Sequence, residues 1–270
     1  MESSAVNDSS LVQAQLLICL VGALAILGIL WLNGGRDANR EPRSKKDARW
    51  AAVFAEESMT AALVLPADRA LLSALAQKCE VALKSLLHDD LLDLSHRELD
   101  DRDAPAIGAL LRANAALEEL VLSHNALGDA TVDALADAHA TPSPLHAALR
   151  ALDLSQNALR GEAAGEALAR LLCRGGAALR RLNVAQNHLG DAGGAALARG
   201  VRDGGARLKK LVLARNALGD QAAYALGAAL ARNRTLGALS LWGNERISAA
   251  ASAQLRAAWQ RSGLLSLDDD

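Results

Sequence analysis

The chain has 270 residues, of which 51% are hydrophobic and only 2% aromatic, and its formal net charge is −2 at pH 7. A core with so few rings has to be built from leucine, alanine and valine, which is more typical of stacked repeats than of an enzyme with a deep pocket. The near-neutral charge argues against a nucleic-acid binder, which usually carries a marked basic excess. The three cysteines lack the spacing of a metal site.

The N-terminal part of the chain predicts a membrane anchor. Residues 1–10 are polar, and an apolar run of 22 residues without a charge follows from Leu11 to Leu32. As an α-helix this run would be about 33 Å long, enough to cross a hydrocarbon core of about 30 Å. A signal peptide would need a basic start and a small-residue cleavage site, and both are missing. Residues 11–32 are therefore predicted to form one transmembrane helix rather than a signal peptide or a buried core helix.

The charges beside this run indicate its orientation. No Lys or Arg precedes it, whereas six follow within the next 17 residues: Arg36, Arg40, Arg43, Lys45, Lys46 and Arg49. Positive flanks stay on the cytoplasmic side of a membrane. The N-terminus is therefore expected outside or in a lumen, and the rest of the chain on the cytosolic or an equivalent side. The basic stretch either only sets this topology or also lies against anionic lipid.

A linker and a helical segment come next. Residues 33–46 combine Gly-Gly, mixed charges and Pro42 and read as a basic linker. Residues 47–87 are predicted to form two helices, from Asp47 to about Thr60 and from Pro66 to about Leu87, because proline suits a first helical turn. We expect these helices to cover an open edge of the structure that follows. The alternative is that they dock a partner in the membrane.

Residues 88–262 repeat one frame, L-x-x-L-x-L-x-x-N-x-L, which is complete at Leu208–Leu218 and is followed there by Gly219-Asp220. Its fourth position falls at residues 92, 120, 152, 182, 211 and 239, so that the copies are 28 to 32 residues apart. The L-x-L alternation predicts a short strand with both leucines on one face. A helical run of alanine and leucine follows each strand. A single copy cannot bury its leucines alone, so neighbouring copies must stack.

The asparagine of the frame falls where the chain turns away from the strand. Its side-chain amide can pair with backbone groups that the turn leaves without partners, and the loss of such a buried partner costs roughly 1–3 kcal/mol. The predicted structural ladder consists of Asn125, Asn157, Asn187, Asn216 and Asn244. The first copy is degraded and carries Arg97 in this position.

These six copies in register resemble the leucine-rich repeat family, and within it the ribonuclease-inhibitor-like branch that also occurs in NOD-like receptors. The resemblance implies an α/β fold: a curved solenoid with parallel strands on the concave side and helices on the convex side. With the segments above, this gives a solenoid with a helical N-terminal cap and one transmembrane helix. The resemblance also implies protein recognition rather than catalysis. Residues 263–270, which end in three aspartates, are expected to form a solvated acidic tail.

The sequence offers little for catalysis or metal binding. It has no glycine-rich phosphate loop with a lysine and no His-Glu-x-x-His motif. The cluster His88, Asp89 and Asp90 suits a cap or a surface better than an acid–base or metal site. His96 and His124 occupy the same position in adjacent repeats and are expected about 4.8 Å apart. A solvated pair is favoured there over a two-histidine metal site. We predict no catalytic residue, no metal and no cofactor.

The variable residues of the concave face are the candidate binding residues. The candidates for contact with a protein partner are Asp93, Glu118, Glu119, Asp153, Arg180, Arg181, Lys209, Lys210, Arg215 and Trp242. The face changes from acidic to basic along the chain, over a distance longer than the screening length of about 8 Å, so its ends should act as separate fields. The alternative is that these are ordinary solubilising charges. Trp242 is either a binding anchor or packs on the last helix.

The predicted function is that of a single-pass membrane-anchored protein that binds other proteins as a recognition module or adaptor, without catalysis. It is expected to bind neither nucleic acid nor a small-molecule substrate. The main alternative is a structural accessory subunit of a large membrane complex of the respiratory or photosynthetic type. A weaker alternative is a regulator of an enzyme or of a small GTPase.

Overall fold

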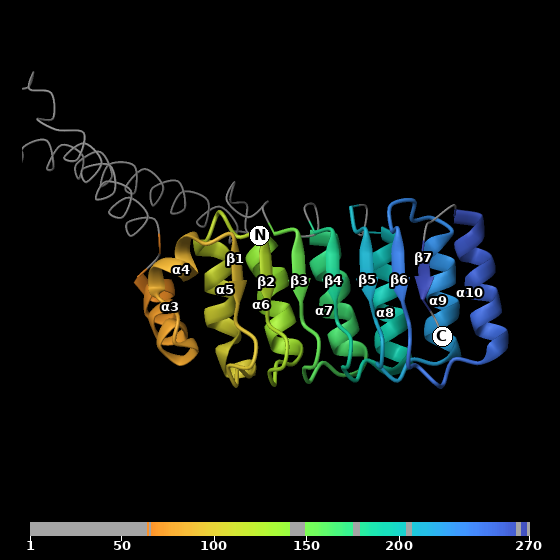
Figure 1. The fold of residues 1–270 in the computed structure, drawn as a ribbon, viewed down its shortest axis with the longest axis horizontal. Helices are drawn as coiled ribbons and strands as arrows, with labels where there is room; N and C mark the ends of the chain where they lie inside the picture. Colours follow the sequence, from red (N-terminus) through yellow and green to blue (C-terminus); the bar gives the residue numbers. More distant parts are fainter. Residues whose placement is uncertain are drawn as a thin grey trace, which may run out of the picture. The chain divides into compact units, whose positions relative to one another are not determined.

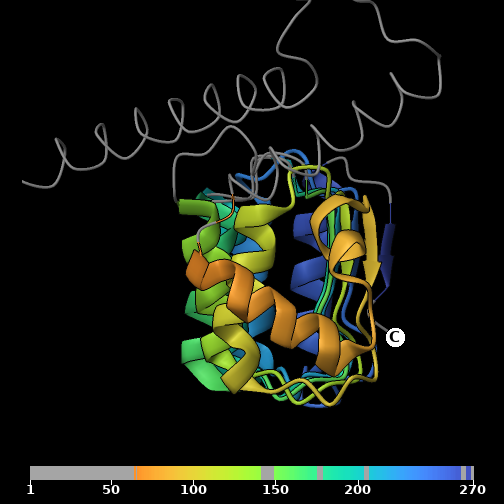
Figure 2. The same cartoon turned by 90° about the vertical axis from the view of Figure 1, so that its left-hand side faces the viewer.

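The computed structural model describes residues 64, 66–140, 149–174, 179–203, 207–262 and 266–268. Almost all of them belong to one compact unit, Ala67–Asp270. This unit has two layers, a sheet of short parallel strands and a row of helices that covers one face of it (Figures 1 and 2). Strand and helix alternate along the chain, which confirms the repeating strand–helix architecture predicted from the leucine frame.

Within the described ranges, seven strands form one sheet, and their order in the sheet is their order in the chain. The strands are β1 Leu91–Asp93, β2 Glu119–Val121, β3 Ala151–Asp153, β4 Arg181–Asn183, β5 Lys210–Val212, β6 Ala238–Ser240 and β7 Ser266–Asp268. Every neighbouring pair is parallel, and the central leucines lie opposite one another, as Leu152 does with Leu182 and Leu182 with Leu211. The predicted register of the copies is therefore correct.

A helix follows each of the first six strands and lies beside the helix of the next repeat. These helices are α5 Ala104–Ala113, preceded by the 3-10 turn η1 Asp101–Asp103, then α6 Asp129–Ala140, α7 Gly161–Arg174, α8 Gly190–Asp203, α9 Asp220–Leu230 and α10 Ala249–Ser262. Their alanine-rich faces allow close approach to their neighbours. Ala196 of α8 and Ala222 of α9, for example, are both fully buried.

The core lies between the two layers and is made of the leucines of the frame. From Leu92 to Leu241 the residues in its apolar positions, including Val184, are between 0 and 4% exposed. Both leucines of the L-x-L alternation point inward, as Leu120 and Leu122 do at 0%. Burial of each such side chain is worth roughly 1.5–3 kcal/mol. The stack is therefore stabilised by contacts between repeats rather than within one repeat.

The end of the chain differs from the expected solvated tail. Ser266–Asp268 forms β7, and Leu267 pairs with Leu239 of β6, one further period along the frame. The pairing gives the backbone groups on the outer edge of β6 a hydrogen-bonding partner, which an open edge would lack. Of the leucine frame, only a short part around Leu267 recurs here, so the three aspartates dominated the prediction and suggested a tail.

The predicted helix from Pro66 to about Leu87 is two helices, α3 Pro66–Cys79 and α4 Leu83–His88. The break occurs at Glu80, which has φ 54°. The N–H of Val81 donates to the carbonyl oxygen of Ala76 at 3.0 Å, a common closure of a helix C-terminus. In Figure 2, α3 crosses the N-terminal end of the two layers. Its residues Leu72 and Leu75 are 0% and 1% exposed.

Aspartates at the start of one helix cap the helix of the next repeat. The Asp101 carboxylate accepts hydrogen bonds from the backbone N–H groups of Gly128 (2.8 Å) and Thr131 (3.2 Å). Asp191 accepts in the same way from Gly219 (2.8 Å) and Ala222 (3.0 Å). The first N–H groups of a helix have no partner within it, and a negative charge is favourable there. Adjacent repeats are thus joined by polar contacts as well as by leucine packing.

Two glycines let α7 and α8 approach closely. A Cβ atom added to Gly165 of α7 would overlap with the backbone carbonyl oxygen of Gly193 of α8, whereas one added to Gly227 of α9 would make ordinary contact with Ala258 at 3.7 Å. We expect Gly165→Ala to lower the free energy of unfolding by about 1–3 kcal/mol because the helices must separate. Gly227→Ala should instead raise it by about 0.4–1 kcal/mol. Denaturant unfolding checks both, and equal effects would contradict this packing.

The predicted transmembrane helix, Leu11–Leu32, lies outside the described residues. So do the polar N-terminus, the linker 33–46 and the helix expected between Asp47 and Thr60. Among the described helices, none is both long enough and apolar enough to cross a lipid bilayer.

Candidate protein-binding surface

The asparagine ladder holds the turns at the ends of the strands. The side-chain amide of Asn157 donates to the carbonyl oxygens of Leu122 (2.9 Å) and Leu154 (3.0 Å), and its oxygen accepts from the N–H of Leu127 at 3.0 Å. Asn187 and Asn216 make equivalent contacts one and two repeats further on. Each amide thus bonds to its own repeat and to the preceding one, which fixes the spacing of the side chains on the strand face.

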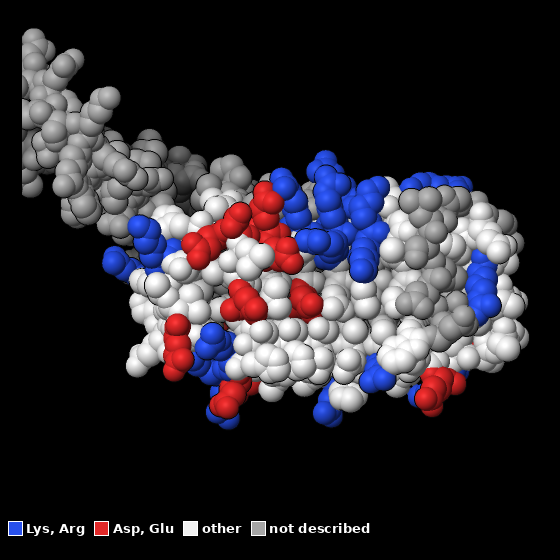
Figure 3. Space-filling model, viewed as in Figure 1, with Lys and Arg blue, Asp and Glu red and all other residues white. Residues whose placement is uncertain are grey.

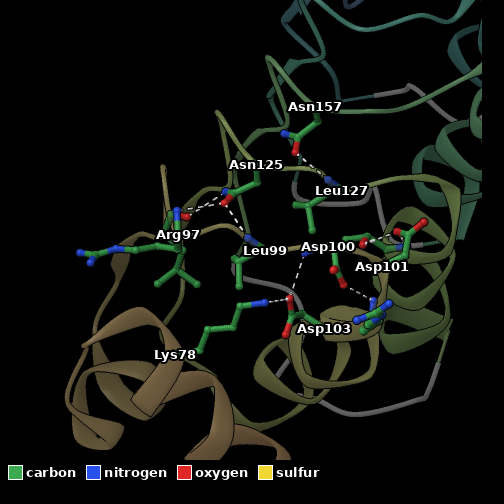
Figure 4. A network of polar contacts seen from close by, with 12 residues as sticks. Lys78, Arg97, Leu99, Asp100, Asp101, Asp103, Asn125, Leu127 and Asn157 are labelled. Atoms are coloured by element: carbon green, nitrogen blue, oxygen red, sulfur yellow. Dashed lines mark hydrogen bonds and ion pairs between the residues drawn. The ribbon is translucent and has the colours of Figure 1, made fainter.

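The first repeat is held in the same way although it carries Arg97 in place of the asparagine. Asn125 of the next repeat accepts from the N–H groups of Arg97 and Leu99, both at 3.0 Å (Figure 4). Behind this turn, the Nζ of Lys78 on α3 lies 2.6 Å from Asp103, which raises the pKa of the lysine through this hydrogen bond. The cap helix α3 and the turn η1 of the first repeat are therefore joined by a polar contact, and Asn125 holds the turn that follows β1.

Two rows of side chains cross the start of the strands. The entry row comes directly before the strands and consists of Asp90, Glu118, Arg150, Arg180 and Lys209. The leading row is the first residue of each strand and consists of Leu91, Glu119, Ala151, Arg181 and Lys210. Backbone hydrogen bonds and the strand register place neighbours in each row side by side. Figure 3 shows acidic side chains over the first strands and basic side chains over the middle strands.

Two ion pairs join the acidic and basic parts of these rows. Arg150 lies 2.7 Å from Glu118, and Arg181 lies 2.8 Å from Glu119. The second pair reaches over Ala151, a small residue that is 6% exposed. All four side chains are more than a third exposed, so each pair contributes at most about 1 kcal/mol to stability. Their main effect is to orient the side chains in the middle of the face.

Charged groups without such pairs remain on both sides of the middle. At the start of β4 and β5, Arg180, Lys209 and Lys210 are exposed and form no ion pair with any described residue. On β1, hydrogen bonds from the hydroxyl and N–H of Ser95 hold the pKa of Asp93 below its usual range. Asp93 is thus a fixed negative charge at the end of β1, and Asp90 is exposed directly before the same strand. The face presents an acidic N-terminal part and a basic middle part.

Trp242 and Arg215 form a separate feature at the other end of the strands. Trp242 is 45% exposed, and the guanidinium carbon of Arg215 lies 4.4 Å from the centre of its ring. The tryptophan ring therefore stacks with Arg215 and remains almost half exposed. Beside it, a shallow hollow of about 490 Å³ is lined by residues of three repeats, including His188, Arg215 and Arg246. Arg215 has φ 54°, as the equivalent residues of the preceding repeats do.

The remaining predicted residues are dispersed or already paired. Asp153 accepts from the Ser155 hydroxyl (2.6 Å) and from the Asn183 amide (2.9 Å). The rings of His96 and His124 stack with their centres 4.0 Å apart. In the described parts of the chain, no three His, Cys, Asp or Glu side chains come together as a metal site would need. Sequence reasoning missed Leu91, which is 53% exposed between the acidic side chains.

A comparison with known families agrees with this architecture. The family described as Leucine Rich repeat matches residues 113–136 and 178–198. The two matched segments include the strands β2 and β4 and the first part of the helix that follows each of them, α6 and α8. No curated protein sequence matches the chain significantly.

Solved structures with a similar arrangement are distant in sequence. Leiomodin-1 Actin-Binding Site 2 is 13% identical, with 72% of this chain and 87% of that chain covered and a TM-score of 0.41. The tropomodulin C-terminal domain of Caenorhabditis elegans is 15% identical, with 73% and 93% covered and a TM-score of 0.39. An internalin from Listeria monocytogenes is 22% identical, with 59% and 36% covered and a TM-score of 0.37.

Proposed function

Because the chain is a leucine-rich repeat protein, we propose that its strand face binds a protein partner and that it carries out no catalytic step of its own. The observation that supports this best is the group of three exposed cations at the start of β4 and β5, which have no ion pair among the described residues: Arg180, Lys209 and Lys210. The partner of this face would present an acidic segment to these cations and an apolar or aromatic side chain to Trp242.

Electrostatics favours an anionic segment at this position. Arg180 and Lys209 come directly before neighbouring strands that lie about 4.8 Å apart, and Lys210 follows Lys209 directly. Like charges so close together repel one another, and an acidic segment would remove the repulsion without any change in the fold. Complementary charge of this kind raises the rate and the specificity of association more than the final affinity.

Trp242 supplies the apolar part of the proposed contact. Its stacking with Arg215, at 4.4 Å, holds the ring in one place before a partner arrives. A side chain that is already ordered loses less conformational entropy on binding. Tryptophan and arginine are also enriched among the residues that contribute most to protein–protein binding. The cations lie at the start of β4 and β5 and Trp242 lies just beyond the end of β6, so a partner segment that runs along the strands could contact both.

Two variants test the proposal in the full chain, purified in a mild detergent with its bound proteins identified by mass spectrometry. We expect Lys209→Glu combined with Lys210→Glu to remove the partner, and Trp242→Ala to weaken its recovery about tenfold or more, as a loss of 1.4 kcal/mol or more would. Arg160→Glu is the matched control because Arg160 is an exposed cation before α7, at the far end of the strands. Loss with all three variants, or with none, would contradict a contact at this face.

The same experiment separates the adaptor from an accessory subunit. Bound proteins that come from one membrane complex, are recovered in amounts equal to this chain and remain bound to every variant would favour the accessory subunit. Soluble companions that depend on Lys209, Lys210 and Trp242 would favour the adaptor.

We also propose that residues 11–32 anchor the chain in a membrane with the repeats on the cytosolic or an equivalent side. The proposal is supported by the uncharged run and by the basic residues after it. Protease added to the outside of sealed vesicles with the cytosolic side outward should degrade the repeats. Protection of the repeats from the protease would contradict the proposed orientation. Release of the chain from the vesicles by alkaline washing would contradict the proposed anchor.

The sequon Asn233-Arg234-Thr235 is no substitute for that measurement. Asn233 is 5% exposed, and its side-chain amide donates to the carbonyl oxygen of Val201 at 2.8 Å. A folded chain would leave this asparagine unmodified on either side of a membrane.

A further inference from the structure

We propose that two copies of this chain associate through their strand faces, about a two-fold axis that runs parallel to the strands and passes over β3. The inference concerns a second copy and is independent of the partner proposed above. It is supported by the order of the charges along the entry row and the leading row.

The entry row is self-complementary about its centre. Its residues are acidic on β1 and β2, at Asp90 and Glu118, and basic on β4 and β5, at Arg180 and Lys209. An axis over β3 exchanges β1 with β5 and β2 with β4 in the second copy. Asp90 then faces Lys209 and Glu118 faces Arg180, and each contact occurs twice because the interface is isologous.

The leading row fits the same axis. Glu119 on β2 faces Arg181 on β4, with Ala151 between them at the axis. Because the ion pair of Glu119 and Arg181 covers Ala151 in each chain, the two ion pairs meet at the axis and can exchange partners. Leu91 on β1 faces Lys210 on β5, whose aliphatic stem can cover an apolar side chain while its charge stays in water. This contact would bury a leucine that is 53% exposed in the single chain.

Other symmetric arrangements of the two faces do not pair opposite charges. An axis across the strands places acidic β1 and β2 over acidic β1 and β2, and likewise basic over basic. The outer charges of the rows, on β1 and β5, are about 19 Å apart at about 4.8 Å per strand. This exceeds the screening length of about 8 Å at physiological ionic strength. The acidic and basic parts therefore act as separate fields. Only the axis parallel to the strands brings the acidic part of one copy to the basic part of the other, so the charges favour this axis.

The association is expected to be weak and dependent on salt. Glu118 and Glu119 already pair with Arg150 and Arg181 of their own chain, at 2.7 and 2.8 Å. The second copy would thus share existing ion pairs rather than neutralise bare charges at these positions. Arg150 would face its own equivalent at the axis, with its charge balanced by Glu118. The rows also cover a narrow band, and small interfaces are typical of transient contacts.

The test uses two differently tagged full-length copies, mixed in mild detergent, and measures how much of one is recovered with the other. The basic variant combines Arg180→Glu with Lys209→Glu, and the acidic variant combines Asp90→Lys with Glu118→Lys. We expect unchanged copies to be recovered together at about 0.01 M salt, with a Debye length of about 30 Å, and not at about 1 M, with about 3 Å. Each variant mixed with itself should fall to background.

The decisive sample is the basic variant mixed with the acidic variant. Every facing pair that contains a substituted residue again joins opposite charges in that mixture, so recovery should return to about the level of the unchanged chain. Cooperative denaturant unfolding of each variant by itself, close to that of the unchanged chain, shows that both variants are folded. No recovery of unchanged copies at low salt, equal recovery of each variant with itself, or no recovery in the crossed mixture would each overturn the proposal.

The substitution Trp242→Ala distinguishes this self-association from the binding of a partner. Trp242 follows β6, outside the five strands that face one another, so Trp242→Ala should leave the recovery of the second copy unchanged. The same substitution is expected to weaken the partner contact. Loss of the second copy with Trp242→Ala would show that the two copies meet through another part of the face.

Discussion

Replacement of Leu182 by alanine is expected to lower the free energy of unfolding by about 2–5 kcal/mol. Leu182 is 1% exposed in the middle of β4, between Leu152 of β3 and Leu211 of β5. The substitution removes buried apolar surface and leaves a cavity that neighbouring repeats cannot close without losing their own register. A whole domain is stable by only about 5–15 kcal/mol, so the loss is a large part of the total.

The loss should spread beyond β4 because each repeat is stabilised by its neighbours. Hydrogen exchange should rise first in the repeats of β3, β4 and β5, and denaturant unfolding gives the total change. Lys209→Ala is the control, since an exposed side chain at this position should change the free energy of unfolding by no more than about 0.5 kcal/mol. Similar losses from both substitutions would mean that the leucines do not form the common core.

The repeating part of the fold could be predicted from the sequence because its cause is local. Each copy has leucines at every second position of a short strand, and the copies recur every 28 to 32 residues. Stacking the copies side by side is the arrangement that buries all of these leucines. The seventh strand was missed because too little of the frame remains after Ser262 for the period to be recognised. The break at Glu80 was missed for a different reason: an uninterrupted apolar pattern does not reveal a residue with φ 54°.

The candidate surface could be predicted only as a set of exposed positions. Alternation along each strand identified Arg181 and Lys210 as outward residues. It could not show that Arg181 reaches Glu119 two strands away, since that contact joins residues 62 apart in the chain. It also could not show which cations stay without a partner. Such contacts depend on the distance between repeats, which the asparagine amides and the aspartate caps fix.

The two proposals for the strand face use the same cations and therefore compete. A second copy would cover Arg180, Lys209 and Lys210, which are also the cations proposed for a partner. Because the self-association is expected to be weak, a partner that also contacts Trp242 would displace it. At a high concentration of the protein, self-association would therefore cover these cations and keep away acidic molecules that bind them only weakly.

Replacement of Asn187 by alanine is expected to lower the free energy of unfolding by about 2–4 kcal/mol. The side-chain oxygen accepts from the N–H of Leu159 at 3.1 Å, and the amide donates to the carbonyl oxygens of Leu154 (2.9 Å) and Val184 (3.0 Å). Asn187 is 2% exposed, so water cannot replace these bonds. At least two buried backbone groups would then lack partners, each at a cost of roughly 1–3 kcal/mol.

Asn187→Asp separates the two halves of the amide. A carboxylate could still accept from Leu159, but it has no N–H to donate and would place a charge against the carbonyl oxygens of Leu154 and Val184. We therefore expect it to be at least as destabilising as alanine. Asn183→Ala is the control. That half-buried side chain donates to Asp153 at 2.9 Å and accepts from the N–H of Ala185 at 3.1 Å on the open face, where water can replace both bonds, so the substitution should cost about 1 kcal/mol or less. Denaturant unfolding of the three variants measures these differences. If Asn187→Asp leaves the free energy of unfolding unchanged, donation to the carbonyl oxygens of Leu154 and Val184 does not hold the turns. The side chains of the strand face would then not be positioned by the asparagine amides.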